Sequence, residues 1–290
     1  MDLVLNAMVS IAFDGLSFAI LLFVISVGLS VTMGLMGFVN LAHGAFAMVG
    51  GYVTVALMTQ AGMPFLAAVA LAALGVAALS VVFERLLYAR FYGEDELKQV
   101  LLTIGLVFMA VAGVTFVWGP NPQIIQTPDY LTGQIDFGFR KFPTYRVFLI
   151  VVGGAIAAAL FFGFDRTRIG AQIRAAVDNR QMAESVGINV GRLFTMTFAL
   201  GSGLAAAGGA LGSEILGIQP TFALDYLVFF LIVVAVGGLG SVRGAFVAAL
   251  LLGVINNAGN YLYPEASGFF IYVVVIAVLL WRPAGLYGKA

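Results

Sequence analysis

Long apolar runs separated by short polar segments dominate this sequence. Most of the runs approach 20 residues, the length that an α-helix needs to cross the hydrocarbon core of a bilayer. The runs cover residues 16–33, 38–57, 65–83, 100–118, 147–164, 194–216, 224–239, 245–262 and 269–281. The pattern predicts an all-α integral membrane protein, a polytopic helical bundle of about 8–9 transmembrane segments forming one domain over residues 1–290.

Composition supports the membrane assignment. The chain is 62% hydrophobic and 10% charged, whereas a soluble domain carries about a quarter charged residues. A β-barrel is disfavoured because its strands alternate apolar and polar residues, and these runs are nearly continuous. The 36 glycines fall largely inside apolar runs, where small residues let membrane helices approach closely. The net charge is zero, so nucleic acid is not an expected partner.

The most polar segment is residues 165–193, between the fifth and sixth runs. Its five arginines are Arg166, Arg168, Arg174, Arg180 and Arg192. Basic loops stay in the cytoplasm, so we expect this loop and the C-terminus inside and the N-terminus outside. This orientation places all but three of the 14 lysines and arginines inside. The exceptions, in the long outer loop 119–146, are Arg140, Lys141 and Arg146.

Within loop 165–193, apolar residues recur at helical spacing from residue 170 to residue 186. Ile173, Val177, Met182, Ala183 and Val186 form the stripe, and Gly187 follows it. The spacing predicts one short amphipathic helix that ends near the glycine. Such a helix either lies on anionic lipid headgroups or seats in a groove on a soluble motor protein.

The second run carries Asn40, His43 and Gly44, which predict a broken or re-entrant helix. Irregular backbone at membrane depth is tolerated where it is buried in protein or lines a water-filled cavity. We therefore expect this stretch to line a translocation pathway. The alternative, which we favour for His43, is that its side chain ties the broken helix to a neighbour.

The outer loop 119–146 contains four prolines and an alternating piece at residues 134–139, which predict an irregular loop with a short hairpin. Arg140, Lys141 and Arg146 in this loop are candidates for docking an acidic partner outside the membrane. Contact with lipid headgroups is an equal alternative.

No catalytic pattern is present. The sequence lacks a phosphate-binding G-x-x-x-x-G-K-[ST] loop, an H-E-x-x-H motif and a G-x-S-x-G motif. Its one histidine has no metal-ligand partners in the pattern, so no metal site or cofactor is expected. Ionisable residues are almost absent from the apolar runs, whereas ion-coupled carriers keep such groups within the bilayer. Neither an enzyme nor a proton-coupled carrier is favoured.

Five stretches together resemble the permease subunits of branched-chain amino acid ABC importers. They are GLMGFVNLAHGAFAMVGGYV (34–53), IRAAVDNRQMAESVGINV (173–190), FALGSGLAAAGGAL (198–211), VAVGGLGSVRGAFVAALLLG (234–253) and RPAGLYG (282–288). They occur in family order and span nearly the whole chain. The length is similar to that of the shorter of the two permease types in such importers.

The resemblance implies an inner-membrane assembly of two permeases, two cytoplasmic ATPases that bind ATP and Mg, and a periplasmic binding protein. It implies that Arg174, Ala183, Glu184 and Gly187 couple the permease to an ATPase. It also implies a paralogous partner permease and branched-chain amino acids as substrates. Urea permeases share much of the pattern, so urea or a short amide is an alternative substrate. A stand-alone channel or secondary transporter is the alternative of another class.

Overall fold

A computed structural model describes residues 2–138 and 140–288, with side chains from residue 7 onward. Within these residues, eight helices are long and apolar enough to cross a membrane. They are α1 (Asp2–Met36), α2 (His43–Ala61), α3 (Phe65–Leu86), α4 (Glu96–Trp118), α5 (Thr144–Arg166), α8 (Val190–Leu211), α12 (Val242–Leu262) and α13 (Ser267–Trp281) preceded by η3 (Pro264–Ala266). The predicted polytopic helical bundle is confirmed.

The run 224–239 does not form one continuous helix. It is divided into α10 (Phe222–Asp225) and α11 (Leu227–Gly237). The 11 residues of α11 extend about 16 Å, roughly half of the hydrocarbon core. The run before it is divided as well, because α8 ends at Leu211 and the short α9 (Ser213–Leu216) follows. Gly217, with φ of +71°, ends α9. The chain between α8 and α11 therefore folds back on itself instead of continuing through the bundle.

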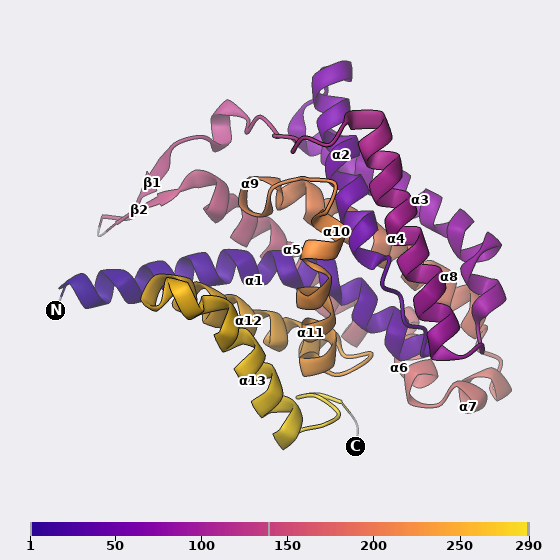
Figure 1. The fold of residues 1–290 in the computed structure, drawn as a ribbon. Helices are drawn as coiled ribbons and strands as arrows, with labels where there is room; N and C mark the ends of the chain where they lie inside the picture. The colour runs from indigo at the N-terminus through magenta and orange to yellow at the C-terminus, as the bar shows by residue number, and fades with distance from the viewer. Residues whose placement is uncertain (1, 139, 289–290) are drawn as a thin grey trace.

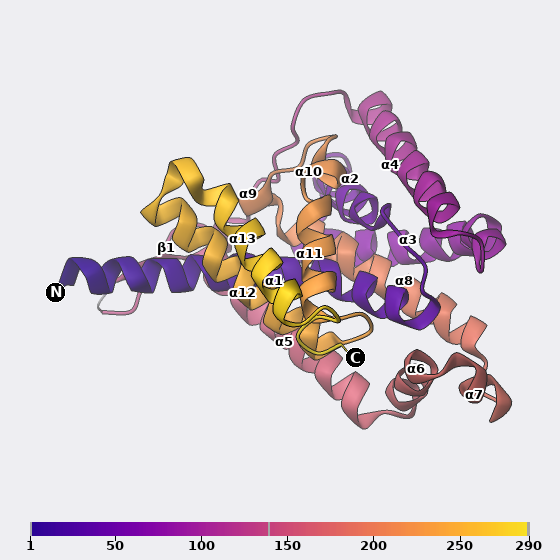
Figure 2. The same cartoon turned by 60° about the horizontal axis from the view of Figure 1, so that its bottom comes forward.

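Helix α1 is the centre of the bundle. Leu22, Phe23, Ile25 and Leu29 in its middle are fully buried, and α5, α8, α11 and α12 pack around it (Figures 1 and 2). Apolar residues on every side of a helix are typical of one enclosed by other helices. The unbroken apolar pattern of residues 16–33 therefore indicates that α1 is enclosed by other helices, and its length indicates a membrane span.

The second apolar run begins with irregular backbone, as predicted. Residues 37–42 are not helical, and α2 starts only at His43. Asn40 holds this segment, because its Oδ1 atom accepts hydrogen bonds from the backbone N–H of Ala42 (3.1 Å) and from the hydroxyl of Tyr88 (3.2 Å). Tyr88 belongs to the short helix η1 (Tyr88–Phe91), in the loop that joins α3 to α4.

Loop 119–146 contains the predicted hairpin. Strands β1 (Gln134–Asp136) and β2 (Lys141–Pro143) pair antiparallel, with Ile135 opposite Phe142, and η2 (Asp129–Leu131) precedes them. Phe139, in the predicted alternating piece, lies outside the described residues. The start of the loop is fixed by a hydrogen bond of 2.8 Å from the N–H of Gln123 to the carbonyl of Ile218.

Two ends of the bundle can be distinguished by the elements that lie there. The start of α1 and the β-hairpin lie at one end, and helices α6 (Arg168–Asp178) and α7 (Arg180–Ser185) lie at the other (Figures 1 and 2). We call them the hairpin end and the α6–α7 end. Arg243 at the start of α12 pairs with Asp165 at 2.5 Å, which places the beginning of α12 at the α6–α7 end.

Candidate functional site

The basic loop between α5 and α8 forms two helices rather than the single helix predicted over residues 170–186. Asn179 separates them in an extended conformation (φ −155°, ψ 101°). Its side chain accepts a hydrogen bond of 3.0 Å from the N–H of Met182 and so caps α7. Asparagine offers the backbone a non-helical alternative of this kind. The apolar spacing continues across the break, which is why periodicity alone missed it.

The α6–α7 unit is fixed firmly to the bundle. Thr167 caps α6 by accepting a hydrogen bond from the N–H of Gly170 (3.1 Å). A Cβ atom on Gly170 would lie 2.3 Å from the carbonyl oxygen of Phe164, so this corner is packed backbone to backbone. Ile173 and Ala176 turn their side chains into the protein. These contacts fix the start of α6 to the end of α5.

Helix α7 presents an exposed tip that the rest of the chain leaves uncovered. The side chains of Met182 and Val186 are 65% and 75% exposed. Arg180 and Glu184 form an ion pair of 2.9 Å on the same helix. Gly187 follows with φ of +87°, a left-handed conformation that glycine adopts without strain. We call Met182, Glu184, Val186 and Gly187 the α7 tip.

The four residues assigned to ATPase coupling are therefore placed differently. Arg174, Glu184 and Gly187 lie on the surface, whereas Ala183 is buried, at 3% exposed. Ala183 packs α7 onto the protein, and its carbonyl accepts a hydrogen bond from the N–H of Ile188 (3.0 Å). Any contact made by Ala183 with a partner would be through the position of α7. The sequence pattern placed Met182, Ala183 and Val186 on one apolar stripe, and the structure divides them, because Met182 and Val186 are exposed while Ala183 is buried.

Asn40, His43 and Gly44 are packed inside the bundle. Asn40 and His43 are 1% and 2% exposed, and Nε2 of His43 lies 2.8 Å from the carbonyl oxygen of Ile25 on α1. A Cβ atom on Gly44 would lie 3.0 Å from the carbonyl oxygen of Ala223. These contacts tie the broken start of α2 to its neighbours, which is the role that we favoured for His43.

The three cations of the outer loop each contact a group of the same chain. Arg140 donates a hydrogen bond to Ser10 and lies over the ring of Phe142. Lys141 lies 4.0 Å from Asp136 across the hairpin. Arg146, at the start of α5, forms an ion pair with Asp14 of α1. Lys141 is the most accessible of the three, with 65% of its side chain exposed.

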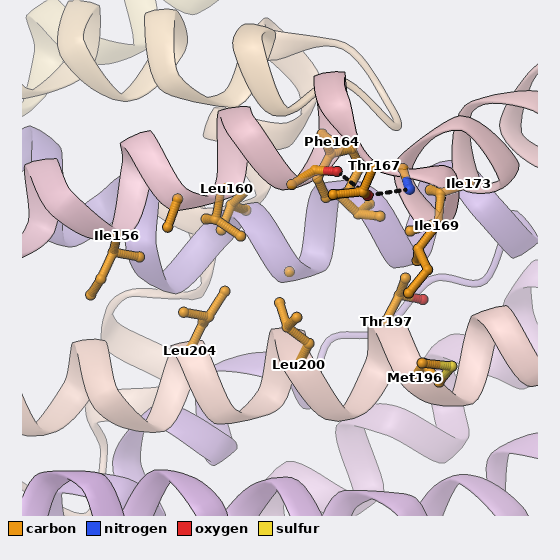
Figure 3. Close-up of a pocket in the computed structure, with 16 residues that line it drawn as sticks. Ile156, Leu160, Phe164, Thr167, Ile169, Ile173, Met196, Thr197, Leu200 and Leu204 are labelled. Carbon is orange, nitrogen blue, oxygen red and sulfur yellow. Dashed lines mark hydrogen bonds between the residues drawn. The ribbon is translucent and has the colours of Figure 1, made fainter.

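An apolar pocket of about 500 Å³ lies between α5 and α8 near the α6–α7 end. Figure 3 shows Leu160 of α5 facing Leu200 and Leu204 of α8 across it. Its lining includes no charged side chain. The hydroxyl of Thr167 donates a hydrogen bond to the carbonyl of Gly163 and accepts one from the N–H of Gly170. Such a lining suits hydrocarbon and offers no partner for the charged groups of a free amino acid.

A second pocket, of about 440 Å³, lies at the hairpin end and is polar. Its lining includes Asp14, Arg146, Asp225 and the three asparagines of α12, Asn256, Asn257 and Asn260. Hydrophobic patterning does not single out these asparagines, because apolar residues surround them. They could have been found in the sequence, because placing three polar amides within a membrane span costs free energy and such residues are often functional.

Glu214, on α9 close to this pocket, has a pKa above its ordinary value. Burial disfavours the charged carboxylate and raises the pKa, while a hydrogen bond from Thr127 (3.3 Å) and the charge of Arg146 oppose the shift.

Comparison with known proteins bears on the function of these sites. Residues 11–279 match the family model described as "Branched-chain amino acid transport system / permease component". The chain is 27% identical over 280 residues to the high-affinity branched-chain amino acid transport system permease protein BraD of Pseudomonas aeruginosa, covering 91% of each chain. It is 27% identical over 292 residues to the LivH permease of the same description from Escherichia coli K12, covering 96% of this chain and 94% of LivH.

The LivM permease of that system in Escherichia coli K12 is also similar. It is 25% identical over 287 residues, which cover 91% of this chain and 67% of LivM. One bacterium therefore has two permeases of the same system that both resemble this chain. LivM is the longer of the two, because the matched region leaves a third of it uncovered.

Proposed function

This chain belongs to the branched-chain amino acid transport permease family, and from that premise we propose that it is a transmembrane subunit of an ATP-driven importer of branched-chain amino acids. The observation that carries the proposal is the α7 tip, an exposed apolar surface on a rigid unit between two spans. A permease that is moved by a separate motor needs such a surface. A stand-alone channel or secondary carrier does not.

In this proposal two cytoplasmic ATPases bind ATP and Mg, and one of them seats the α7 tip in a groove. Met182 and Val186 supply apolar contact, while Glu184 and Arg174 supply charge. Because α6 joins α5 through a packed backbone corner, a displacement of α7 is transmitted to α5 and α8. The spans then move relative to α1 and open the pathway to one side or the other.

The orientation follows from the distribution of basic residues. The α6–α7 end carries the arginine-rich loop, so it faces the cytoplasm of a bacterial inner membrane, and the hairpin end faces outward. A periplasmic binding protein delivers substrate at the hairpin end, with Arg140 and Lys141 as contacts for acidic groups. A second permease, a paralogue of this chain, completes the membrane part, and lipid covers the remaining apolar surface.

The test is uptake of radiolabelled leucine into proteoliposomes that contain both permeases and the ATPases, with binding protein outside and ATP inside. Val186→Arg in the α7 tip is compared with Ile124→Arg, an exposed residue of the outer loop that is 83% exposed. We expect Val186→Arg to abolish ATP-dependent uptake and Ile124→Arg to preserve it. Leucine flux without ATP would instead support a channel or secondary carrier.

A parallel measurement with labelled urea addresses the alternative substrate. ATP-dependent urea uptake in the absence of leucine uptake would overturn the proposed substrate and retain the importer. The binding protein has to be exchanged for its urea-specific counterpart in this measurement, because recognition in the proposed assembly begins there.

A further inference from the structure

Three asparagines lie in the last part of α12, among apolar residues and glycines. Asn256 is six residues before the end of the helix at Leu262, about 9 Å along its axis. Asn257 donates a hydrogen bond to the carbonyl of Gly253 (2.9 Å). Within the described residues, the side-chain amides of Asn256 and Asn260 have no hydrogen-bond partner. Asn260 is exposed and lies two residues before the end of the helix, whereas Asn256 is half-buried and lies deeper. An unpaired amide at the depth of Asn256 is costly unless it faces water or a ligand.

The asparagines line the polar pocket together with charges of both signs. Asp14 on α1, Arg146 on α5 and Asp225 on α10 are among the lining residues. Helices that are distant in sequence thus bring two carboxylates and one guanidinium to a single cavity. Asp14 and Arg146 are each about one-third exposed, so the cavity communicates with the outside of the bundle.

The carboxylate of Asp225 is held in place with one oxygen free. Its Oδ2 atom accepts hydrogen bonds from Nε2 of Gln219 (2.7 Å) and from the hydroxyl of Thr221 (2.8 Å). No hydrogen bond to Oδ1 is formed within the described residues. Arg146 is similarly available, because its guanidinium has five N–H donors and one nitrogen faces Asp14.

Part of the cavity lining is apolar, and we call this part its floor. Phe18, one turn after Asp14 on α1, meets Phe229 of α11 edge to face at 6.0 Å between ring centroids. Leu216 and Tyr226 also line the cavity, and the Tyr226 hydroxyl is occupied by the carbonyl of Leu216 at 3.0 Å. A volume of about 440 Å³ lies within the range of small-molecule pockets.

We propose that this cavity is a transit site for a zwitterionic α-amino acid with an apolar side chain. The inference rests on the proposed function and assigns a site to its substrate. Asp225 receives the ammonium group, Arg146 and the asparagine amides receive the carboxylate, and the aromatic floor contacts the side chain. Each charged group of the ligand then has a partner of opposite sign, and the amides of α12 gain the partners that they lack.

The test uses the absence of cysteine from this chain. Asn256→Cys and, separately, Asn260→Cys place one thiol at the cavity, and Thr132→Cys places one on the exposed outer loop as a control. A membrane-impermeant maleimide reacts with the assembled importer in oriented vesicles, and labelling is measured on the band of this chain. Two cavity positions are used so that one poorly folded variant does not decide the result.

We expect leucine to slow labelling at the cavity. For a dissociation constant of about 1 mM, leucine at about 10 mM slows the reaction roughly tenfold. Leucinamide, which lacks the carboxylate, and isocaproate, which lacks the ammonium group, protect much less. Thr132→Cys reacts equally under all conditions. Asp225→Asn in the Asn256→Cys background removes the protection by leucine.

The outcomes separate this site from the proposed function. Leucine import by the wild-type assembly without protection of either cavity cysteine overturns the transit site alone. Equal protection by leucine, leucinamide and isocaproate also overturns it, because the cavity would then recognise only the apolar side chain. Protection without ATP-dependent import supports the site and overturns the importer.

Discussion

Gly28 of α1 and Gly201 of α8 meet backbone to backbone. A Cβ atom added to Gly28 would lie 2.2 Å from the Cα atom of Gly201, and one added to Gly201 would lie 2.7 Å from the Cα atom of Gly28. Neither helix can keep this crossing with a larger residue at the contact. The absence of side chains here allows α8 to approach the central helix closely.

Gly28→Ala is therefore expected to destabilise the bundle, by about 1–3 kcal/mol, because the added methyl group overpacks the crossing. Gly154→Ala in α5 is the matched control, since no atom lies within 4 Å of a Cβ added there. Its stability should be unchanged or raised by up to about 1 kcal/mol through helix propensity. Thermal unfolding followed by size-exclusion chromatography in detergent measures both. Equal melting temperatures for the two variants would contradict the packing argument.

A buried carboxylate joins α3 to α8. Glu84 is 3% exposed and accepts hydrogen bonds from the hydroxyl of Tyr92 (2.5 Å) and from the hydroxyl of Thr195 (2.9 Å). Burial and the neighbouring carboxylate together raise the pKa of Tyr92, so its hydroxyl remains a donor.

Glu84→Ala removes the acceptor of the half-buried Tyr92 hydroxyl and one of the two acceptors of the Thr195 hydroxyl, and we expect a loss of about 1–3 kcal/mol. Glu84→Gln keeps an acceptor oxygen and should lose less. Glu94→Ala is the control, because its ion pair with Lys98 is exposed and contributes about 0–1 kcal/mol. Chemical denaturation in detergent gives the three values. A loss for Glu94→Ala as large as that for Glu84→Ala would show that the bonds to Glu84 are not stabilising.

The sequence was sufficient for the membrane class, for eight spans and for the hairpin, because each depends on the local run of apolar or turn-forming residues. It was insufficient for features that depend on contacts between residues distant in the sequence or on a specific hydrogen bond. The run 224–239 is apolar enough for a span, and its division at Tyr226 into α10 and α11 becomes visible only in three dimensions. Asn179 lies within a continuous apolar period, and its capping bond is visible only in three dimensions.

The candidate sites divide in the same way. His43 and Glu184 stand out in a sequence because their neighbours differ from them. Asn256 and Asn260 acquire meaning only because α1, α5 and α10 bring Asp14, Arg146 and Asp225 to the same cavity. Met182 and Ala183 were placed on the same apolar stripe, because periodicity identifies a helix face and not which of its residues the protein itself covers.

The break at Asn179 should matter for coupling. Asn179→Ala removes the cap of α7, which costs about 1 kcal/mol locally, and favours one continuous helix from α6 into α7. The α7 tip would then point in a different direction. Asn179→Asp keeps a capping oxygen and is the control. We expect lower ATP-dependent uptake for Asn179→Ala at equal amounts of assembled importer. Unchanged uptake would mean that coupling to the ATPase does not depend on the angle between α6 and α7.

The raised pKa of Glu214 predicts a pH dependence of stability. A carboxyl whose pKa is higher in the folded protein binds more protons folded than unfolded, so its contribution to stability decreases as the pH rises above the ordinary glutamate pKa of 4.5. Arg146 lowers this pKa, and Arg146→Gln should therefore extend the decrease to higher pH. Glu214→Gln should remove this part of the pH dependence. Melting temperatures between about pH 4 and pH 7 measure the three slopes. A wild-type slope that persists in Glu214→Gln would assign the titration to another group.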